Sequence, residues 1–365
     1  MRRHRVTVLG AAVLTAVLAG SFTWYISGLP THRPDFAMMW AAMQLRDPYD
    51  RAALVAALHW EAKFPVAFVY PPTALPLFGL LGLMSMRAAL VLWAAVSAAA
   101  MALASRSRWA PFLLLTPPML WAIPGGQTSV LLGAILLGCL LLLDRPVLSG
   151  LLLGFALCLK PQVALALPLL LAVERRWDVL VAAAATFALM AALSALLFGP
   201  AEWVQWARSL PAFIRLHEAN PLLHRNEIAP GLPLWIRAAA LLAGGVLAAI
   251  ALRRGNPVEA FAIAAGAGLV GSAHAMGYEF AMFVPTLPAL IGRRGWSASA
   301  IILFVMIPGF IWFGLPPFPF RFLALLLLMA AAAVDGLLAP RAQPELASAG
   351  PAHENDGEMV KEPCG

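Results

Sequence analysis

Charged side chains are scarce in this sequence. Asp, Glu, Lys and Arg make up 12% of its 365 residues, whereas hydrophobic residues make up 62%. A soluble domain carries about twice that share of charge, so the composition excludes one and predicts an all-α polytopic membrane protein. Lys and Arg outnumber Asp and Glu by 25 to 18, but the basic residues stand in short clusters between apolar runs. Such clusters are typical of cytoplasmic loops, so membrane lipids are expected as partners and nucleic acid is not.

Cysteine is also rare, and metal-binding patterns are missing. Cys139 and Cys158 lie in apolar runs and Cys364 in the polar tail, with no paired spacing. The three cysteines therefore indicate neither a disulfide framework nor a zinc site. The long polar segments contain no HExxH, CxxC or DxD motif, which argues against a metalloprotease and against a metal-dependent nucleotide-sugar transferase. No metal and no cofactor are expected.

The first apolar run follows the basic start MRRHR and extends from Val6 to Leu29. A cleaved signal peptide is one explanation, because AVLAGS offers a small-residue cleavage site. An uncleaved span is preferred, since about 20 apolar residues suffice to cross a hydrocarbon core of roughly 30 Å. The basic start then places the N-terminus in the cytoplasm, and residues 30–64 form a first external loop.

Short polar interruptions divide the rest of the chain into further apolar segments. Residues 200–233 form a second long polar loop, and residues 339–365 have the composition of a disordered tail. Twelve spans place both termini in the cytoplasm and both long loops outside. Most arginines, Arg87 among them, then lie inside as the positive-inside rule requires, whereas Arg106 and Arg108 do not fit. The predicted spans lie near residues 6–29, 66–85, 87–104, 109–124, 128–143, 147–173, 178–199, 234–252, 257–275, 278–292, 297–314 and 318–338.

The first external loop contains the candidate catalytic residue, Asp35. It precedes Phe36, Met39, Trp40 and Met43, whose spacing predicts an amphipathic helix on the membrane surface, and the turn at residues 48–50 introduces a second such helix. A carboxylate where a span meets water can take a proton from a bound hydroxyl. The alternative is that Asp35 is only an N-cap, whose oxygen accepts a hydrogen bond from a backbone N–H.

Two polar residues interrupt the apolar runs farther along the chain. Lys160, in LCLKPQ, lies in an otherwise uncharged apolar run, where a cation is costly without a partner. It is predicted to bind an anion, most naturally a phosphate, and a lysine that snorkels from a broken helix end is the alternative. Gln127 follows a Pro-Gly-Gly turn, in which the backbone approaches a neighbour closely.

His274 lies at the outer end of a predicted span, in GSAHAMGYEF. If this segment is helical, the imidazole comes within reach of Tyr278 and Glu279, about one turn farther on. The alternative is a capped histidine at the membrane interface.

Seven short motifs follow one another in a characteristic order. They are DFxxxW at Asp35 to Trp40, PYD at Pro48 to Asp50, FxYPP at Phe68 to Pro72, GQTS at Gly126 to Ser129, GxxxGxxxxLKPQ at Gly150 to Gln162, RRW at Arg175 to Trp177 and SxHxxxYE at Ser272 to Glu279. Their order and spacing resemble the polyprenol-phosphate-dependent glycosyltransferases of family 87, which belong to the GT-C class. The likeness extends over roughly residues 30–290.

This resemblance implies a GT-C-like bundle of about twelve transmembrane helices over residues 1–338. It also implies inverting transfer of a hexose, mannose by likeness, from a polyprenyl-phosphate sugar to a lipid or glycan acceptor on the periplasmic face of a bacterial inner membrane. Asp35 matches the family's catalytic position and would be the general base. Lys160 and His274 would bind the donor phosphate. The residues expected to contact substrate are Tyr70, Gln127, Gln162, Tyr278 and Glu279.

Two features depart from the family pattern. The second outer loop of such proteins often holds an Asn-x-Ser-like element, and the nearest match here is residues 226–228, Asn-Glu-Ile, which leaves the acceptor open. The late motif commonly ends in Asp, whereas Glu279 has a longer side chain. A transporter or flippase for a lipid-linked or anionic substrate is the alternative function, since broken helices and a lysine at membrane depth also describe a substrate path. The two halves of the sequence share no repeat that would favour it.

Overall fold

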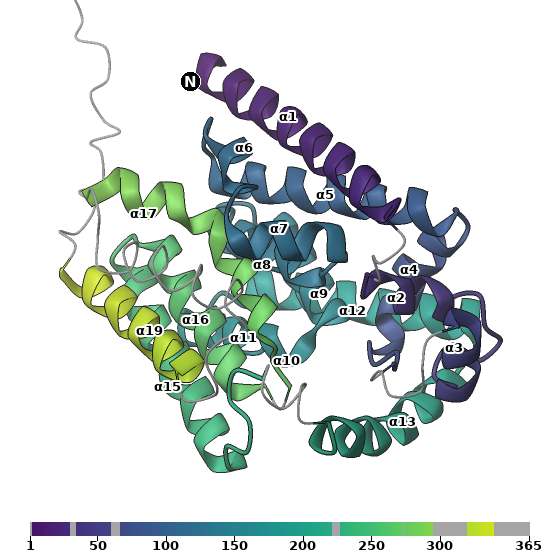
Figure 1. Cartoon of the computed structure of the whole chain (residues 1–365). Coiled ribbons are helices and arrows are strands. Elements are labelled where there is room, and N and C mark those ends of the chain that lie inside the picture. The colour runs from purple at the N-terminus through teal and green to yellow at the C-terminus, as the bar shows by residue number, and fades with distance from the viewer. Residues whose placement is uncertain are drawn as a thin grey trace, which may run out of the picture.

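The computed structural model describes residues 2–29, 34–59, 66–220, 227–272, 274–294 and 320–338. Over these residues the chain is a bundle of helices (Figure 1), with one isolated antiparallel β-bridge between Glu227 and Met276. The predicted all-α class is therefore confirmed. The helices are α1 (Arg2–Ser27), α2 (Phe36–Ala42), α3 (Arg51–Leu58), η1 (Pro72–Ala74), α4 (Leu75–Gly82), α5 (Met86–Ser105), α6 (Ala110–Leu113), α7 (Pro117–Gly125), α8 (Thr128–Leu141), α9 (Pro146–Leu159), α10 (Pro161–Ala164), α11 (Ala166–Val173), α12 (Trp177–Phe198), α13 (Ala201–Glu218), α15 (Leu234–Arg253), α16 (Pro257–Gly271), η2 (Gly277–Thr286), α17 (Leu287–Arg294) and α19 (Phe320–Leu338), of which η1 and η2 are 3₁₀ helices.

Four of the described helices are long and apolar enough to cross a membrane alone, namely α1, α5, α12 and α15. A fifth span results if α7 and α8, which meet at a bend of 110°, are counted together. The other described helices at predicted spans are short or broken, and the predicted span 297–314 and the predicted tail 339–365 lie outside the described residues. The count of about twelve spans therefore stays a prediction.

Three arginine contacts show which helix ends lie together. Arg106 donates a hydrogen bond to the carbonyl of the last residue of α8 at 3.0 Å, and Arg176 donates to a carbonyl two residues after α8. Arg253 pairs with Glu174 at 2.7 Å, directly after α11. The C-terminal ends of α5, α8, α11 and α15 therefore share one end of the bundle with the start of α12. We call it the arginine end, and the opposite end, where α8 begins, the site end.

Residues 66–85 do not cross the bundle as predicted. The side chain of Arg51, in the first loop, donates to the carbonyl of Val66 at 3.1 Å. The indole of Trp40, in the same loop, donates to the carbonyl of Met84 at 2.9 Å. Between these points η1 and α4 cover only residues 72–82. Because both ends of the segment contact the first loop, the chain folds back here, and the predicted span is wrong.

This reversal also changes the side of the nearby arginines. Arg87, in the first turn of α5, donates to the carbonyl of Trp24 at 2.6 Å and lies 3.6 Å over its ring, near the end of α1. Farther along the same two helices Ala12 packs with Ala102, so α1 and α5 are antiparallel. Arg87 therefore lies at the end of α1 away from the N-terminus, and Arg106 at the other end, the reverse of the predicted sides.

The predicted single span 147–173 is in fact two helical legs. The hydroxyl of Ser149 donates to the carbonyl of Cys139 at 2.9 Å, which places the start of α9 beside the last turn of α8. Proline cannot donate a backbone hydrogen bond and disfavours a helical residue before it, so Pro161 ends α9 at Lys160, whose φ and ψ are −151° and 72°. From there α10 and α11 return to Glu174 at the arginine end. Lys160 thus lies at the turn between two legs.

Two helices, α2 and α3, form within the segment that was predicted to be the first external loop. The carboxylate of Asp50 caps α3 by accepting hydrogen bonds from the backbone N–H groups of Ala52 and Ala53, at 2.9 and 3.1 Å. In α2, Phe36 and Met39 of the predicted apolar stripe are buried, and the helix packs against α3, α4 and α5. The position of both helices on a membrane surface stays a prediction.

Candidate functional site

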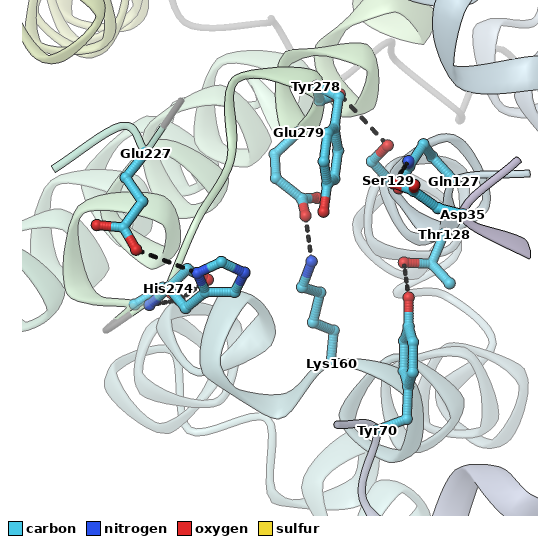
Figure 2. A network of polar contacts seen from close by, with 11 residues as sticks. Asp35, Tyr70, Gln127, Thr128, Ser129, Lys160, Glu227, His274, Tyr278 and Glu279 are labelled. Atoms are coloured by element: carbon cyan, nitrogen blue, oxygen red, sulfur yellow. Dashed lines mark hydrogen bonds and ion pairs between the residues drawn. The ribbon is translucent and has the colours of Figure 1, made fainter. Parts of the chain in front are cut away.

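Asp35 does not cap α2, although it immediately precedes this helix. Its backbone is helical, at φ −58° and ψ −27°, and its side chain accepts no hydrogen bond from the first turn. Instead, the side-chain amide of Gln127 donates to its Oδ2 (Figure 2). Burial raises the pKa of the Asp35 carboxyl above its ordinary value of 3.8, while the Gln127 hydrogen bond and the charge of Lys160 lower it. The N-cap alternative is therefore wrong for this structure.

Gln127 reaches Asp35 because the chain bends sharply just before it. Gly126 ends α7 with φ +67° and ψ 33°, a left-handed conformation that glycine adopts without steric cost. A Cβ atom at this position would lie 2.5 Å from Cβ of Phe36 and 2.8 Å from Cδ1 of Leu90. The glycine thus lets the bend between α7 and α8 lie directly against the residue that follows Asp35.

Lys160 forms a buried ion pair with Glu279. The side chain of Lys160 is 9% exposed and that of Glu279 is 0% exposed, and the ammonium lies 5.8 Å from the ring centroid of Tyr278. Lys160 therefore does not snorkel to a surface. Oε2 of Glu279 has no hydrogen-bond partner among the described residues. A buried polar atom without a partner is costly, which makes this oxygen a candidate contact for a ligand.

Two tyrosines stand beside these charged groups. The hydroxyl of Tyr70 lies 3.2 Å from the hydroxyl of Thr128, in the first turn of α8. Ser129, one residue on, donates to the backbone carbonyl of Tyr278 at 3.4 Å. Close packing holds η2 here, because a Cβ at Gly133 would lie 2.3 Å from the carbonyl oxygen of Met282. The start of α8 is therefore in contact with the segments that carry both tyrosines.

The predicted grouping of His274 with Tyr278 and Glu279 on one helix is wrong. No helix covers residues 274–276: Met276 is extended, at φ −98° and ψ 158°, and η2 begins only at Gly277. Nδ1 of His274 lies 3.3 Å from Oε1 of Glu227, in the second long polar loop, while Glu279 pairs with Lys160. The sequence drew attention to His274, but it contained no signal that Glu227 was its partner.

One predicted contact residue, Gln162, remains. Gln162 is half-buried in α10, two residues after Lys160, and the structure gives its side chain no hydrogen bond to a described residue. Two hydroxyls that the sequence did not single out, Thr128 and Ser129, belong to the site. The sequence did contain an indication of these two residues, because both lie in the GQTS motif that includes Gln127. Asp35, Tyr70, Gln127, Lys160, Tyr278 and Glu279 are thus brought together from five distant segments.

Comparison with known proteins identifies the family of this chain. The model of glycosyltransferase family 87 matches residues 68–276, more than half of the chain. The chain belongs to glycosyltransferase family 87. No curated protein and no solved structure matches it. Family 87 membership makes the protein a membrane glycosyltransferase and confirms the predicted transferase class over the transporter alternative.

The family 87 match covers only part of the site. Tyr70, Gln127, Lys160 and His274 lie inside the matched residues. Asp35 precedes them, and Tyr278 and Glu279 follow them. The structure joins the two sets, because Asp35 contacts Gln127 and Glu279 contacts Lys160. The two acidic site residues outside the match, Asp35 and Glu279, are thus each hydrogen-bonded to a residue inside it.

Proposed function

We propose that this family 87 enzyme transfers a hexose, with mannose as the first sugar to test, from a polyprenyl-phosphate donor to a lipid or glycan acceptor. The reaction takes place at the site end, on the external face of a bacterial inner membrane, and inverts the anomeric centre. The observation that carries the proposal is the contact of the Asp35 carboxylate with Gln127, beside Lys160, rather than with the helix that it precedes.

Asp35 acts as the general base. It takes the proton of an acceptor hydroxyl while that oxygen bonds to C1 of the sugar. The bond from C1 to the phosphate oxygen breaks, and its electron pair leaves with polyprenyl phosphate. A carboxylate with a raised pKa is a stronger base than an ordinary one, which favours this proton transfer. Attack opposite the leaving group inverts C1.

Lys160 stabilises the phosphate while it stays paired with Glu279. An ammonium group has three N–H donors, and Glu279 occupies one of them. The other two are available for phosphate oxygens, whose negative charge grows as the bond to C1 breaks. The free Oε2 of Glu279 accepts a hydrogen bond from a sugar hydroxyl. His274 is the second donor to the phosphate, and Tyr70, Tyr278 and Gln162 line the sugar.

The depth of Lys160 suits a donor that enters from the bilayer. The 14 residues of α9 rise about 21 Å from the arginine end, short of the roughly 30 Å hydrocarbon core. Lys160 then lies below the external surface, where a lipid-linked phosphate reaches it with its tail still between the helices. A water-soluble nucleotide sugar has no need of a cation at this depth.

The replacement of Asp35 by Asn tests the proposed base. Asn keeps the size of the side chain but cannot take the proton, so turnover should fall about 100-fold to 10,000-fold. Stability should be unchanged, because Asp35 caps no helix. The assay uses membranes supplied with radiolabelled polyprenyl-phosphate mannose and measures label transferred to endogenous acceptors.

Asp50→Asn is the matched control, since Asp50 lies in the same loop and only caps α3, a role that Asn also fills. Its turnover should stay near that of the wild type. Turnover by folded Asp35→Asn within a few-fold of wild type would refute the base, and Glu279 would be the next carboxylate to test. If the wild type transfers no label from mannose, glucose or galactose donors, the polyprenyl-phosphate donor itself is refuted.

A further inference from the structure

The second external loop reaches the site through a short strand-like contact. The backbone N–H of Ile228 donates to the carbonyl of Ala275 at 2.7 Å, and Glu227 and Met276 form the isolated β-bridge. The segment around His274 is itself held in shape. The hydroxyl of Ser272 donates to the carbonyl of His274 at 2.7 Å and accepts from its N–H at 3.2 Å. Backbone pairing therefore places Glu227 opposite the histidine segment.

One buried arginine ties the same two segments together. Arg237, at the start of α15, donates to the carbonyls of Ala229 and Leu232 at 2.7 and 3.0 Å. Its guanidinium also donates to the carbonyl of Val270, at 3.2 Å, and to that of Ser272, directly before the histidine segment. The residue is 8% exposed. The side chain of Arg237 thus fixes the position of the loop relative to the end of α16.

The side chains of His274 and Glu227 are in contact between these two segments. Nδ1 of His274 lies 3.3 Å from Oε1 of Glu227, and the side chains are only 22% and 12% exposed. The ring of Phe213, from α13, meets the imidazole edge-on at 5.1 Å and 88°. In the view of Figure 2 the imidazole lies between Glu227 and Lys160, with its other nitrogen on the side of Lys160. A carboxylate at Nδ1 requires a proton on that nitrogen and sets the orientation of the ring.

We infer that Glu227 is the positioning residue of His274. It accepts a hydrogen bond from Nδ1–H and turns Nε2 toward the donor phosphate, where Nε2, once it also carries a proton, donates to a phosphate oxygen. The second external loop is therefore part of the active site. This inference rests on the proposed role of His274 at the phosphate. If Glu227 had only a structural role, it would stabilise the loop but would affect neither the tautomer of His274 nor the contact of His274 with the phosphate.

Nitrogen-15 NMR of the imidazoles tests the tautomer directly. The full-length protein, labelled at its seven histidines and held in lipid nanodiscs, is measured at alkaline pH, where an ordinary imidazole is neutral. The His274 signal is the one that His274→Gln removes. We expect its proton on Nδ1 in the wild type and in Glu227→Gln, whose amide oxygen still accepts the hydrogen bond. Glu227→Leu should give a mixture of tautomers.

Sugar transfer from the polyprenyl-phosphate donor tests whether Glu227 acts through His274. Glu227→Leu should lower kcat/KM about 10- to 100-fold, as for the orienting partners of metal-bound histidines, and Glu227→Gln should recover most of the loss. In a His274→Gln background, Glu227→Leu should cost less than about twofold more. Glu174→Gln, which breaks the surface ion pair with Arg253, is the matched control and should be fully active.

The outcomes separate this inference from the proposed function. A wild-type His274 with its proton on Nε2 overturns the inference, and this measurement needs no variant that folds poorly. An equal loss from Glu227→Leu with and without His274 also overturns it. The Nδ1–H tautomer, lost in Glu227→Leu, in a protein that transfers no sugar from the donor would support the pairing and refute the proposed donor.

Discussion

The Asp35 carboxylate is subject to opposing effects. Burial raises its pKa, and the hydrogen bond from Gln127 and the charge of Lys160 lower it, with a net value above 3.8. Only the deprotonated carboxylate can take the acceptor proton. Sugar transfer should therefore be full above this raised pKa and should be lost as the pH falls through it, at a higher pH than for an ordinary aspartate.

The Gln127 hydrogen bond should control the position of this acid limb. Gln127→Met keeps the length of the side chain but removes the donor that stabilises the charged carboxylate. The pKa of Asp35 should rise further, and the acid limb of the kcat profile should move to higher pH. Gln44→Met is the control, because within the described part of the chain the side chain of Gln44 donates only to the carbonyl of Gly82, at 2.9 Å. An acid limb that does not move in Gln127→Met would contradict the assignment of the limb to Asp35.

The buried pair of Lys160 and Glu279 makes a stability prediction. Lys160→Met leaves a fully buried carboxylate without its cation, which typically costs about 3–5 kcal/mol. The double variant Lys160→Met/Glu279→Gln removes both charges and should recover most of this stability in thermal unfolding. It should not recover the binding of polyprenyl phosphate, because the cation is still missing. Wild-type affinity in the double variant would show that Lys160 does not bind the phosphate.

At the scale of elements, the site residues come from places where helices break. Gln127 lies at the bend between α7 and α8, Lys160 at the turn between α9 and α10, and His274 between α16 and η2. Broken ends leave backbone groups without helical partners, and such ends are tolerated at membrane depth only where protein satisfies them. The hydroxyl of Thr73 does so for the carbonyl of Cys158, at 3.0 Å. The same breaks free polar side chains to face one another.

The bend at Gly126 should be sensitive to a single methyl group. Gly126→Ala adds the cost of a left-handed alanine, about 1–2 kcal/mol, to a clash with Phe36. Because Phe36 follows Asp35, the clash should also displace the base and lower kcat. Gly231→Ala isolates the backbone cost, since Gly231 has φ +68° and open space around its Cβ position. Equal stability and activity in the two variants would show that close packing at Gly126 does not position Asp35.

At the scale of the whole molecule, the corrections to residues 66–85 and 147–173 bring more of the arginines into agreement with the positive-inside rule. Arg106 and Arg108 did not fit a cytoplasmic position when residues 66–85 were taken as a span. Once that segment folds back, Arg106 lies at the arginine end with Arg176 and Arg253. Because residues 147–173 form two helical segments instead of one span, the later helices still run in the directions that were predicted for them. We therefore predict that the arginine end is cytoplasmic.

Cysteine labelling in the full chain tests this topology. Leu83, 84% exposed, lies between α4 and α5 at the site end, and Arg108 lies just beyond α5 near the arginine end. In a Cys364→Ser background, where the two remaining native cysteines are buried, Leu83→Cys should react with a membrane-impermeant maleimide from outside. Arg108→Cys should react only after the membrane is permeabilised. The reverse pattern would restore residues 66–85 as a span.

The sequence alone determined the membrane class and the family resemblance, and it named most of the candidate site residues. Long apolar runs and short motifs are local features, so they can be read without a fold. Only the tertiary structure decided which polar side chains pair, because Asp35 and Gln127 lie 92 residues apart and Lys160 and Glu279 lie 119 apart. Spacing along a chain says nothing about contacts between helices. It also decided which apolar runs turn back, since hydropathy reports that a segment avoids water and not the direction in which it runs.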